Sequence, residues 1–122
     1  MHVRTFNQHL YEQYKEQGEC CLYCGDKTPF ELITRDHFYP VSKGHTLQNN
    51  KIFSCRKCNS TKGNMSLDDF KQIVLNLIYK TLRSIIRNKW MVSKKHHDTI
   101  SWGSKVLKNL SKLKDNPPKL FT

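Results

Sequence analysis

The spacing of apolar residues along the chain predicts helices at both ends and in the middle. Phe6, Leu10 and Tyr14 recur every four residues, as on one stripe of a short helix, and Gly18 is a suitable stop. A longer stripe predicts one helix over residues 67–90. Its apolar members are Phe70, Ile73, Val74, Leu77, Ile78, Leu82, Ile85 and Ile86.

The long helix also has a start signal, because Ser66 can accept a backbone N–H and Asp69 can reach back to complete a capping box. Residues 93–103 are polar and interrupted by Gly103, so we expect the last helix to be short, over residues 104–114. Its apolar side consists of Val106, Leu107, Leu110 and Leu113.

Two short strands are expected between the first and the long helix. Residues 32–39 are rich in strand-forming types and end at Pro40. Residues 42–50 are polar and typical of a loop, and residues 51–54 predict the second strand. Short strands and helices in this order indicate an α+β fold class.

The charge of the chain indicates the kind of partner that it binds. The 122 residues are enough for one domain, and their net charge is +11. Residues 1–61 carry eight basic and six acidic residues, whereas residues 62–122 carry thirteen and four. Such asymmetry favours a polyanion, usually nucleic acid, over an anionic membrane surface. No apolar run approaches the roughly 20 residues that cross a bilayer, so we expect no membrane role.

Five cysteines complete the candidate chemistry. Their odd number, without a visible secretory signal, argues against a disulfide framework and for the reducing cytoplasm. Two Cys-x-x-Cys pairs are typical of one tetrahedral zinc site. Cys20 could replace Cys21, but Cys21 reproduces the spacing of the second pair. The predicted ligands are Cys21, Cys24, Cys55 and Cys58.

The thirty residues between the pairs exceed the roughly 15–20 of an ordinary zinc ribbon. Within or beside this insertion, Asp36 and Asn59 offer hard oxygen ligands suited to Mg²⁺. His37, next to Asp36, can take a proton from water near neutral pH. A base and a hard cation are what metal-assisted phosphodiester hydrolysis requires.

The segments CLYCG and TRDHFYPVSKGHTLQNNKIFSCRKCNSTKG, within residues 21–63, resemble the HNH nuclease family in its variant with four zinc-binding cysteines. The resemblance implies a ββα-metal finger held by a four-cysteine zinc site. An N-terminal helix, the long helix and a basic helical tail would flank it. We expect a nuclease domain over residues 1–92, with its finger at 20–65, and a basic extension over 93–122 that is weakly packed. The alternative is that Val106, Leu107, Leu110 and Leu113 dock on the long helix and make the extension part of the core or of a dimer.

The resemblance also assigns roles to single residues. His37 matches the general base, and Asp36 and Asn59 match the ligands of the catalytic divalent metal. Asn50 matches an asparagine that braces the loop and orients the histidine, with Asn49 as the neighbouring alternative.

Several basic residues are expected to contact nucleic acid. Lys62 matches the basic position after the second cysteine pair, and His45 stands where the family frequently has a second glycine. The expected contacts are Lys43, His45, Lys62, Lys94 and Lys95.

These observations predict an endonuclease that hydrolyses DNA, with RNA as the alternative substrate. Its catalytic cofactor would be Mg²⁺ or another divalent metal such as Mn²⁺ or Ni²⁺, beside a structural Zn²⁺. One finger makes one active site, so a double-strand cut would require a homodimer, a larger nucleic-acid-processing complex or sequential nicks. The alternative function is a non-catalytic zinc-ribbon module that only binds nucleic acid.

Overall fold

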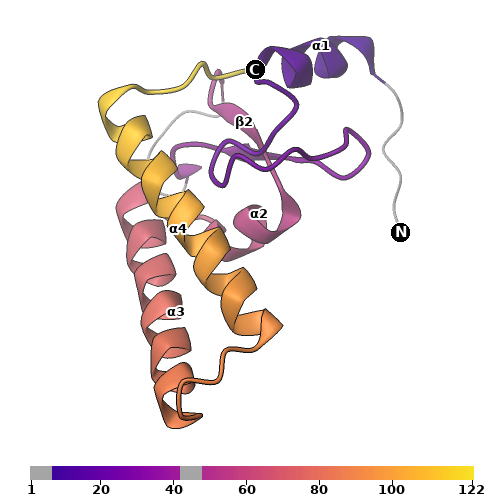
Figure 1. Ribbon diagram of the computed structural model, residues 1–122. Helices are drawn as coiled ribbons and strands as arrows, with labels where there is room; N and C mark the ends of the chain where they lie inside the picture. Colours follow the sequence, from indigo (N-terminus) through magenta and orange to yellow (C-terminus); the bar gives the residue numbers. More distant parts are fainter. Residues whose placement is uncertain (1–6, 42–47) are drawn as a thin grey trace.

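The computed structural model describes residues 7–41 and 48–122, and combines a small sheet with helices (Figure 1). This confirms the α+β class. The lysine and histidine expected in the loop, Lys43 and His45, lie outside the described residues, as does Phe6. In chain order the elements are α1 (Gln8–Glu16), β1 (Thr34–His37), β2 (Lys51–Ser54), α2 (Arg56–Lys62), α3 (Leu67–Arg87) and α4 (Lys94–Asp115).

The two strands form an antiparallel sheet at the expected place. β1 occupies the middle of the predicted strand at 32–39, and β2 coincides with the predicted strand at 51–54. Thr34 faces Ser54 and His37 faces Lys51 across the pair. Within the described residues, no helix is long and apolar enough to cross a membrane.

The sheet separates two apolar cores, because successive side chains of a strand point to opposite faces. Ile52 of β2 belongs to a core that also includes residues of α3 and α4, whereas the next residue, Phe53, packs against Tyr14 of α1. The second core also contains Phe121 from the end of the chain.

The outer edge of β2 is covered rather than left open. The Gln17 side chain donates to the Phe53 carbonyl (2.7 Å) and accepts from the Phe53 N–H (2.9 Å). Backbone hydrogen bonds also join Lys51 and Phe121 in both directions. Edge groups that would otherwise invite another strand are thereby satisfied.

The long helix α3 starts where the sequence predicts it. The Ser66 hydroxyl accepts from the Asp69 N–H at 3.2 Å, which satisfies one of the free donors at the helix start. The helix ends at Arg87 rather than at residue 90, because Lys89 and Trp90 adopt φ values of 55° and 67°. Such a conformation lies outside the right-handed helix.

The last helix is longer than predicted. α4 begins at Lys94, not at residue 104, because Ser93 and His96 form a capping box at its start. Gly103 lies inside the helix instead of interrupting it. A Cβ there would come within 3.0 Å of the Ile78 side chain, so the glycine allows α4 to approach α3 closely.

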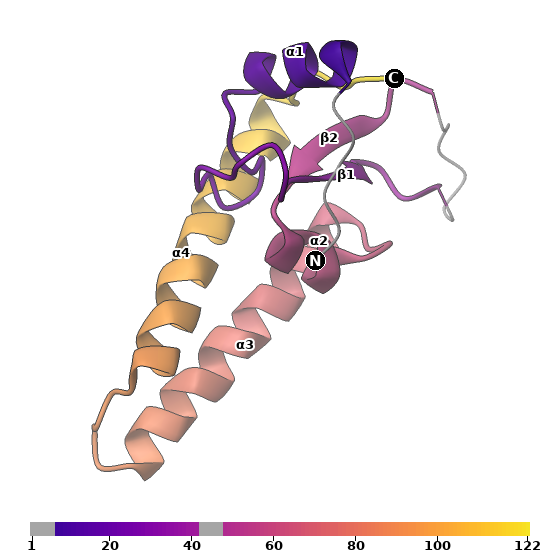
Figure 2. The same cartoon turned by 90° about the vertical axis from the view of Figure 1, so that its right-hand side faces the viewer.

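Helices α3 and α4 run antiparallel and side by side, and their joined ends project away from the sheet (Figures 1 and 2). Trp102, Val106 and Leu110 of α4 are buried in the core that contains Ile52. The expectation of a weakly packed tail was therefore wrong. The division of the chain after residue 92 stays a prediction.

Candidate active site

The four paired cysteines meet at the junction of two chain segments. Cys21 and Cys24 precede the sheet, and Cys55 and Cys58 follow β2 into α2. Their sulfur atoms all lie within 4.8 Å of one another, and the Cys24 and Cys55 sulfurs are 3.8 Å apart. A tetrahedral zinc ion with Zn–S distances of about 2.3 Å requires a sulfur–sulfur edge of about 3.8 Å. The four sulfur atoms are therefore close enough together to hold one zinc ion.

Hydrogen bonds to the sulfur atoms support this assignment. The Cys24 N–H donates to the Cys21 sulfur (3.5 Å), the Cys58 N–H to the Cys55 sulfur (3.4 Å), and the Trp102 indole to the Cys58 sulfur (3.3 Å). Donors directed at sulfur stabilise thiolates, the form that binds metal.

Cys20 does not join the cluster. Its thiol lies 3.7 Å from the Gln17 carbonyl, to which it donates, and burial raises its pKa. The choice of Cys21 over Cys20 as the first member of the group agrees with the geometry.

The expected catalytic pair stands at the end of β1, which stops at His37. Strict alternation would place the Asp36 and His37 side chains on opposite faces, but the strand ends at His37, where alternation no longer applies. Asp36 turns back, so that its Oδ1 accepts from the His37 N–H at 2.8 Å. Burial raises the pKa of the Asp36 carboxyl, and the neighbouring Lys62 amine opposes that shift.

Lys62 links α2 to this strand end. Its amine donates to the His37 carbonyl (3.2 Å) and lies 3.7 Å from Asp36 Oδ2. The residue is fully buried, and this burial lowers the pKa of its amine. The expected contact between Lys62 and a phosphate does not fit this position. Its amine instead fixes the backbone of the candidate base.

Asn50 braces the loop that follows β1. Its Oδ1 accepts from the Tyr39 N–H and its Nδ2 donates to the Tyr39 carbonyl, both at 2.9 Å. The Asn50 carbonyl also accepts from Phe38, next to His37. Asn49 is exposed with a φ of 51°, so Asn50 has the geometry of the brace.

The orientation of α2 supports Asn59 as the third candidate residue of the active site. Asn59 lies three residues before Lys62 on this helix, so the two side chains share one face. Lys62 reaches Asp36 and His37 from that face. The half-buried Asn59 therefore belongs to the side of α2 that faces β1.

Two buried polar atoms at this place have no hydrogen-bond partner among the described residues, namely Asp36 Oδ2 and His37 Nε2. Buried polar atoms are nearly always paired, so such atoms need an explanation. A divalent cation and a water molecule fit them, because a carboxylate oxygen is a hard ligand and an imidazole nitrogen accepts a proton.

A family model described as HNH endonuclease matches residues 21–75, which include all four clustered cysteines and the end of β1. This segment is similar to the HNH endonuclease family. Among curated proteins, none matches the chain.

This chain is similar to a solved structure, the crystal structure of the Type II-C Cas9 enzyme from Actinomyces naeslundii. The TM-score is 0.42 and the sequence identity 21%. The match covers 82% of this chain and 10% of the Cas9 chain, so this chain spans only about a tenth of that protein's length.

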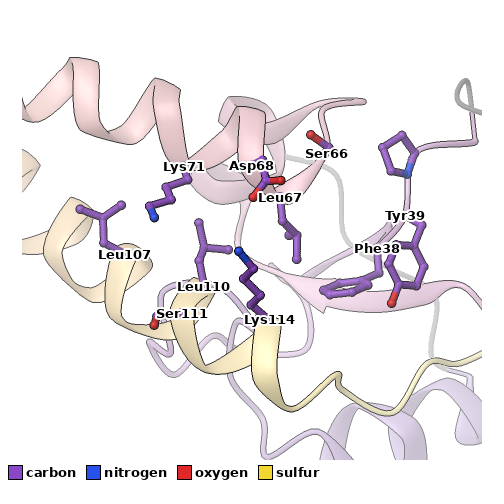
Figure 3. Close-up of a pocket in the computed structure, with 11 residues that line it drawn as sticks. Phe38, Tyr39, Ser66, Leu67, Asp68, Lys71, Leu107, Leu110, Ser111 and Lys114 are labelled. Atoms are coloured by element: carbon purple, nitrogen blue, oxygen red, sulfur yellow. The ribbon is translucent and has the colours of Figure 1, made fainter.

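A surface hollow of about 470 Å³ lies beside the HNH strand end, between the start of α3 and the end of α4 (Figure 3). Phe38 and Tyr39, which directly follow His37, form part of its wall, and the exposed Lys71 and Lys114 also line it. No sequence pattern indicated these lysines as a pair, since only the packing of α4 on α3 brings them to one hollow.

Of the other expected basic contacts, Lys94 and Lys95 are exposed in the first turn of α4. The start of α4 lies at the projecting end of the helix pair (Figure 1), and Lys94 lies eight residues before Trp102, which contacts Cys58. The structure thus separates them from the candidate active site.

Proposed function

We propose that this protein is a metal-dependent endonuclease that hydrolyses phosphodiester bonds in DNA. The observation that carries the proposal is a pair of buried atoms, Asp36 Oδ2 and His37 Nε2, that make no hydrogen bond within residues 7–41 and 48–122. They lie at one strand end of a segment that matches the HNH endonuclease family model. A module that only binds nucleic acid has no need of a buried imidazole nitrogen that makes no hydrogen bond within the described residues, because such burial costs stability.

In this proposal His37 is the general base that takes a proton from the attacking water at Nε2. Its position depends on two backbone contacts, from its N–H to Asp36 and from the Lys62 amine to its carbonyl. Asn50 holds the next two residues of the chain. The histidine is thus fixed at its backbone while its ring nitrogen stays available.

Asp36 and Asn59 would hold the catalytic divalent metal, which supplies a positive charge for the phosphate and the leaving oxygen when it is bound. Asp36 has Oδ2 available for this purpose, since Oδ1 is used by the His37 N–H. The cysteine cluster would hold a structural zinc ion that ties the segment before the sheet to α2.

The test is cleavage of supercoiled plasmid by the purified protein, with and without Mg²⁺, Mn²⁺ or Ni²⁺. We expect metal-dependent nicking or linearisation. His37→Ala should slow cleavage by about 10²- to 10⁴-fold, as expected for loss of a general base, while DNA binding and the melting temperature stay close to those of the parent protein.

The matched control is His9→Ala, which removes an exposed histidine of α1 and should cut at the parent rate. Equal cleavage by the His37→Ala protein would contradict the assignment. Tight DNA binding by the parent protein without cleavage in any of the three metals would favour the alternative, a non-catalytic zinc-ribbon module.

A further inference from the structure

The projecting end of the helix pair carries apolar side chains in solvent. We define the hairpin tip as residues 79–98, the end of α3, the connection and the start of α4. Six of the eight large apolar residues that the described part of the chain leaves exposed lie here. They are Tyr79, Leu82, Ile86, Trp90, Met91 and Val92.

The spacing of these apolar residues places several of them on one helix face. Tyr79, Leu82 and Ile86 follow the three- and four-residue spacing of one helix face, and Trp90 continues it into the connection. Trp90 is 74% exposed, as is Met91. The other tryptophan, Trp102, is only 7% exposed, so the tip presents the one indole of the described chain that a partner could contact broadly.

The backbone of the connection is unusual at the same position. Lys89 and Trp90 both have positive φ, at 55° and 67°. A bulky residue in this region is strained, and such strain clusters at binding and catalytic sites. Three backbone hydrogen bonds hold the turn. The N–H groups of Lys89 and Trp90 donate to carbonyls in the last turn of α3, and the Met91 N–H donates to the Asn88 carbonyl just after it. The exposed indole is therefore held in a closed turn.

Charge indicates the partner. The tip contains six Lys and Arg residues against one acidic residue, Asp98. The basic residues are Lys80, Arg83, Arg87, Lys89, Lys94 and Lys95. A second copy of the chain would bring like charges together, which is unfavourable, whereas a polyanion complements them.

The tip is also hollowed. A surface depression of about 430 Å³ adjoins the turn, and Arg87, Asn88, Lys89 and His96 supply its polar lining beside Met91 and Val92. His96 is already engaged with Ser84 and Ser93. The arginine, asparagine and lysine side chains are groups that can donate to phosphate oxygens and base edges.

We propose that the hairpin tip is a second nucleic-acid contact, at which Trp90 stacks on an unpaired base while Arg87 and Lys89 bind the adjacent phosphates. An exposed aromatic ring among cations is the arrangement that binds single strands without reading their sequence. The inference rests on the proposed nuclease function, since it assumes that nucleic acid is the substrate of this chain.

The length of α3 sets the distance between this contact and the candidate active site. The 21 residues of α3 span about 30 Å at about 1.5 Å each, nearly one turn of duplex DNA, so Trp90, just beyond the helix end, lies about that far from the start of α3. Leu67, at that start, lines the hollow beside the HNH strand end. The tip would hold a strand roughly one duplex turn from the candidate cleavage site.

The experiment measures binding of the full chain to a labelled DNA single strand of about 30 nucleotides and to the duplex of the same length. The proteins are the parent, Trp90→Ala, Trp90→Phe, Arg87→Ala/Lys89→Ala, and Lys108→Ala as a control. Lys108 is an exposed lysine of α4 outside the tip. Tryptophan fluorescence, plasmid cleavage and melting temperature are recorded for each protein.

We expect Trp90→Ala to weaken single-strand binding by about 5- to 100-fold, with a smaller effect on the duplex, and Trp90→Phe to restore most of it. The double variant should flatten the dependence of log affinity on log salt by about 1.4, for two phosphate contacts to a single strand. DNA should quench the fluorescence of the parent but not of Trp90→Phe, whereas Lys108→Ala should bind like the parent.

Failures of the two proposals are distinguishable. A parent protein that neither binds nor cuts DNA would overturn the nuclease proposal, and this inference with it. A parent protein that cuts DNA while Trp90→Ala binds both probes unchanged would overturn the inference alone. A dimer of the parent protein that Trp90→Ala dissociates would also overturn the inference. Binding to anionic phospholipid vesicles that depends on Trp90 would do so too, if DNA binding does not depend on Trp90.

Discussion

At the scale of the residue, Lys62 shows how this chain positions its chemistry. A buried amine is costly unless it is paired, and its partners here are the Asp36 carboxylate and the His37 carbonyl. The lysine therefore holds together the two residues proposed to hydrolyse phosphodiesters. Its role is to position them.

Replacing this lysine should be costly. Lys62→Met keeps most of the volume but leaves the Asp36 carboxylate buried without its cation, and should lower the free energy of unfolding by about 3 kcal/mol. Urea denaturation measures this loss. Lys108→Met, an exposed lysine of α4, is the control and should leave stability unchanged. Equal stability of the two variants would mean that Lys62 is not needed to hold Asp36.

At the scale of the element, the cysteine cluster ties together parts of the chain that have few other means of doing so. The first pair precedes a two-stranded sheet, which is marginal by itself, and the second pair begins α2, a helix of only seven residues. Trp102 of α4 donates to the Cys58 sulfur, so α4 also depends on this cluster.

Metal analysis of the purified protein should therefore give one zinc ion per chain. Cys58→Ser should abolish zinc binding and cooperative unfolding of the segment, because metal binding and folding are coupled at such sites. The fluorescence of the buried Trp102 should shift towards that of an exposed indole. Cys20→Ser is the control and should retain both zinc and stability, since Cys20 lies outside the cluster. A zinc-free, cooperatively folded parent protein would contradict the structural role.

At the scale of the whole molecule, the end of the chain completes both cores. Trp102, Val106 and Leu110 pack with Phe70 and Val74 of α3, and Phe121 seals the core beneath α1. Figure 1 shows the C-terminus beside α1, at the end opposite the hairpin tip. The segment expected to be a basic extension is part of the packing.

A fragment of residues 1–92 should therefore be insoluble, or should melt far below the full chain, because deletion of α4 exposes the apolar face of α3 to water. Thermal unfolding of the fragment and of the full chain measures the difference. The Phe121→Ala protein provides a milder comparison, since it removes one buried ring and should lower stability by about 3 kcal/mol. A fragment that melts like the full chain and cuts DNA would show that residues 1–92 are a domain of their own.

The sequence by itself determined the chemistry that depends on local spacing. Two Cys-x-x-Cys pairs indicated the cysteine cluster, and the strand-forming residues before Pro40 indicated a strand that ends near Asp36-His37; the structure contains both. The role of Asn50 was implied by the resemblance to the HNH family, and its two hydrogen bonds to Tyr39 agree with a brace. Spacing is informative here because each Cys-x-x-Cys pair is a short-range turn that presents two thiolates to one ion.

Only the tertiary structure decided what depends on contacts between distant segments. Gly103 resembled a helix break, but the close approach of α3 makes a glycine favourable inside α4. Lys62 resembled a surface cation, but the fold buries it against β1. The exposure of Trp90 and the burial of Trp102 likewise follow from where the two helices stop touching, because burial is a property of the packed molecule.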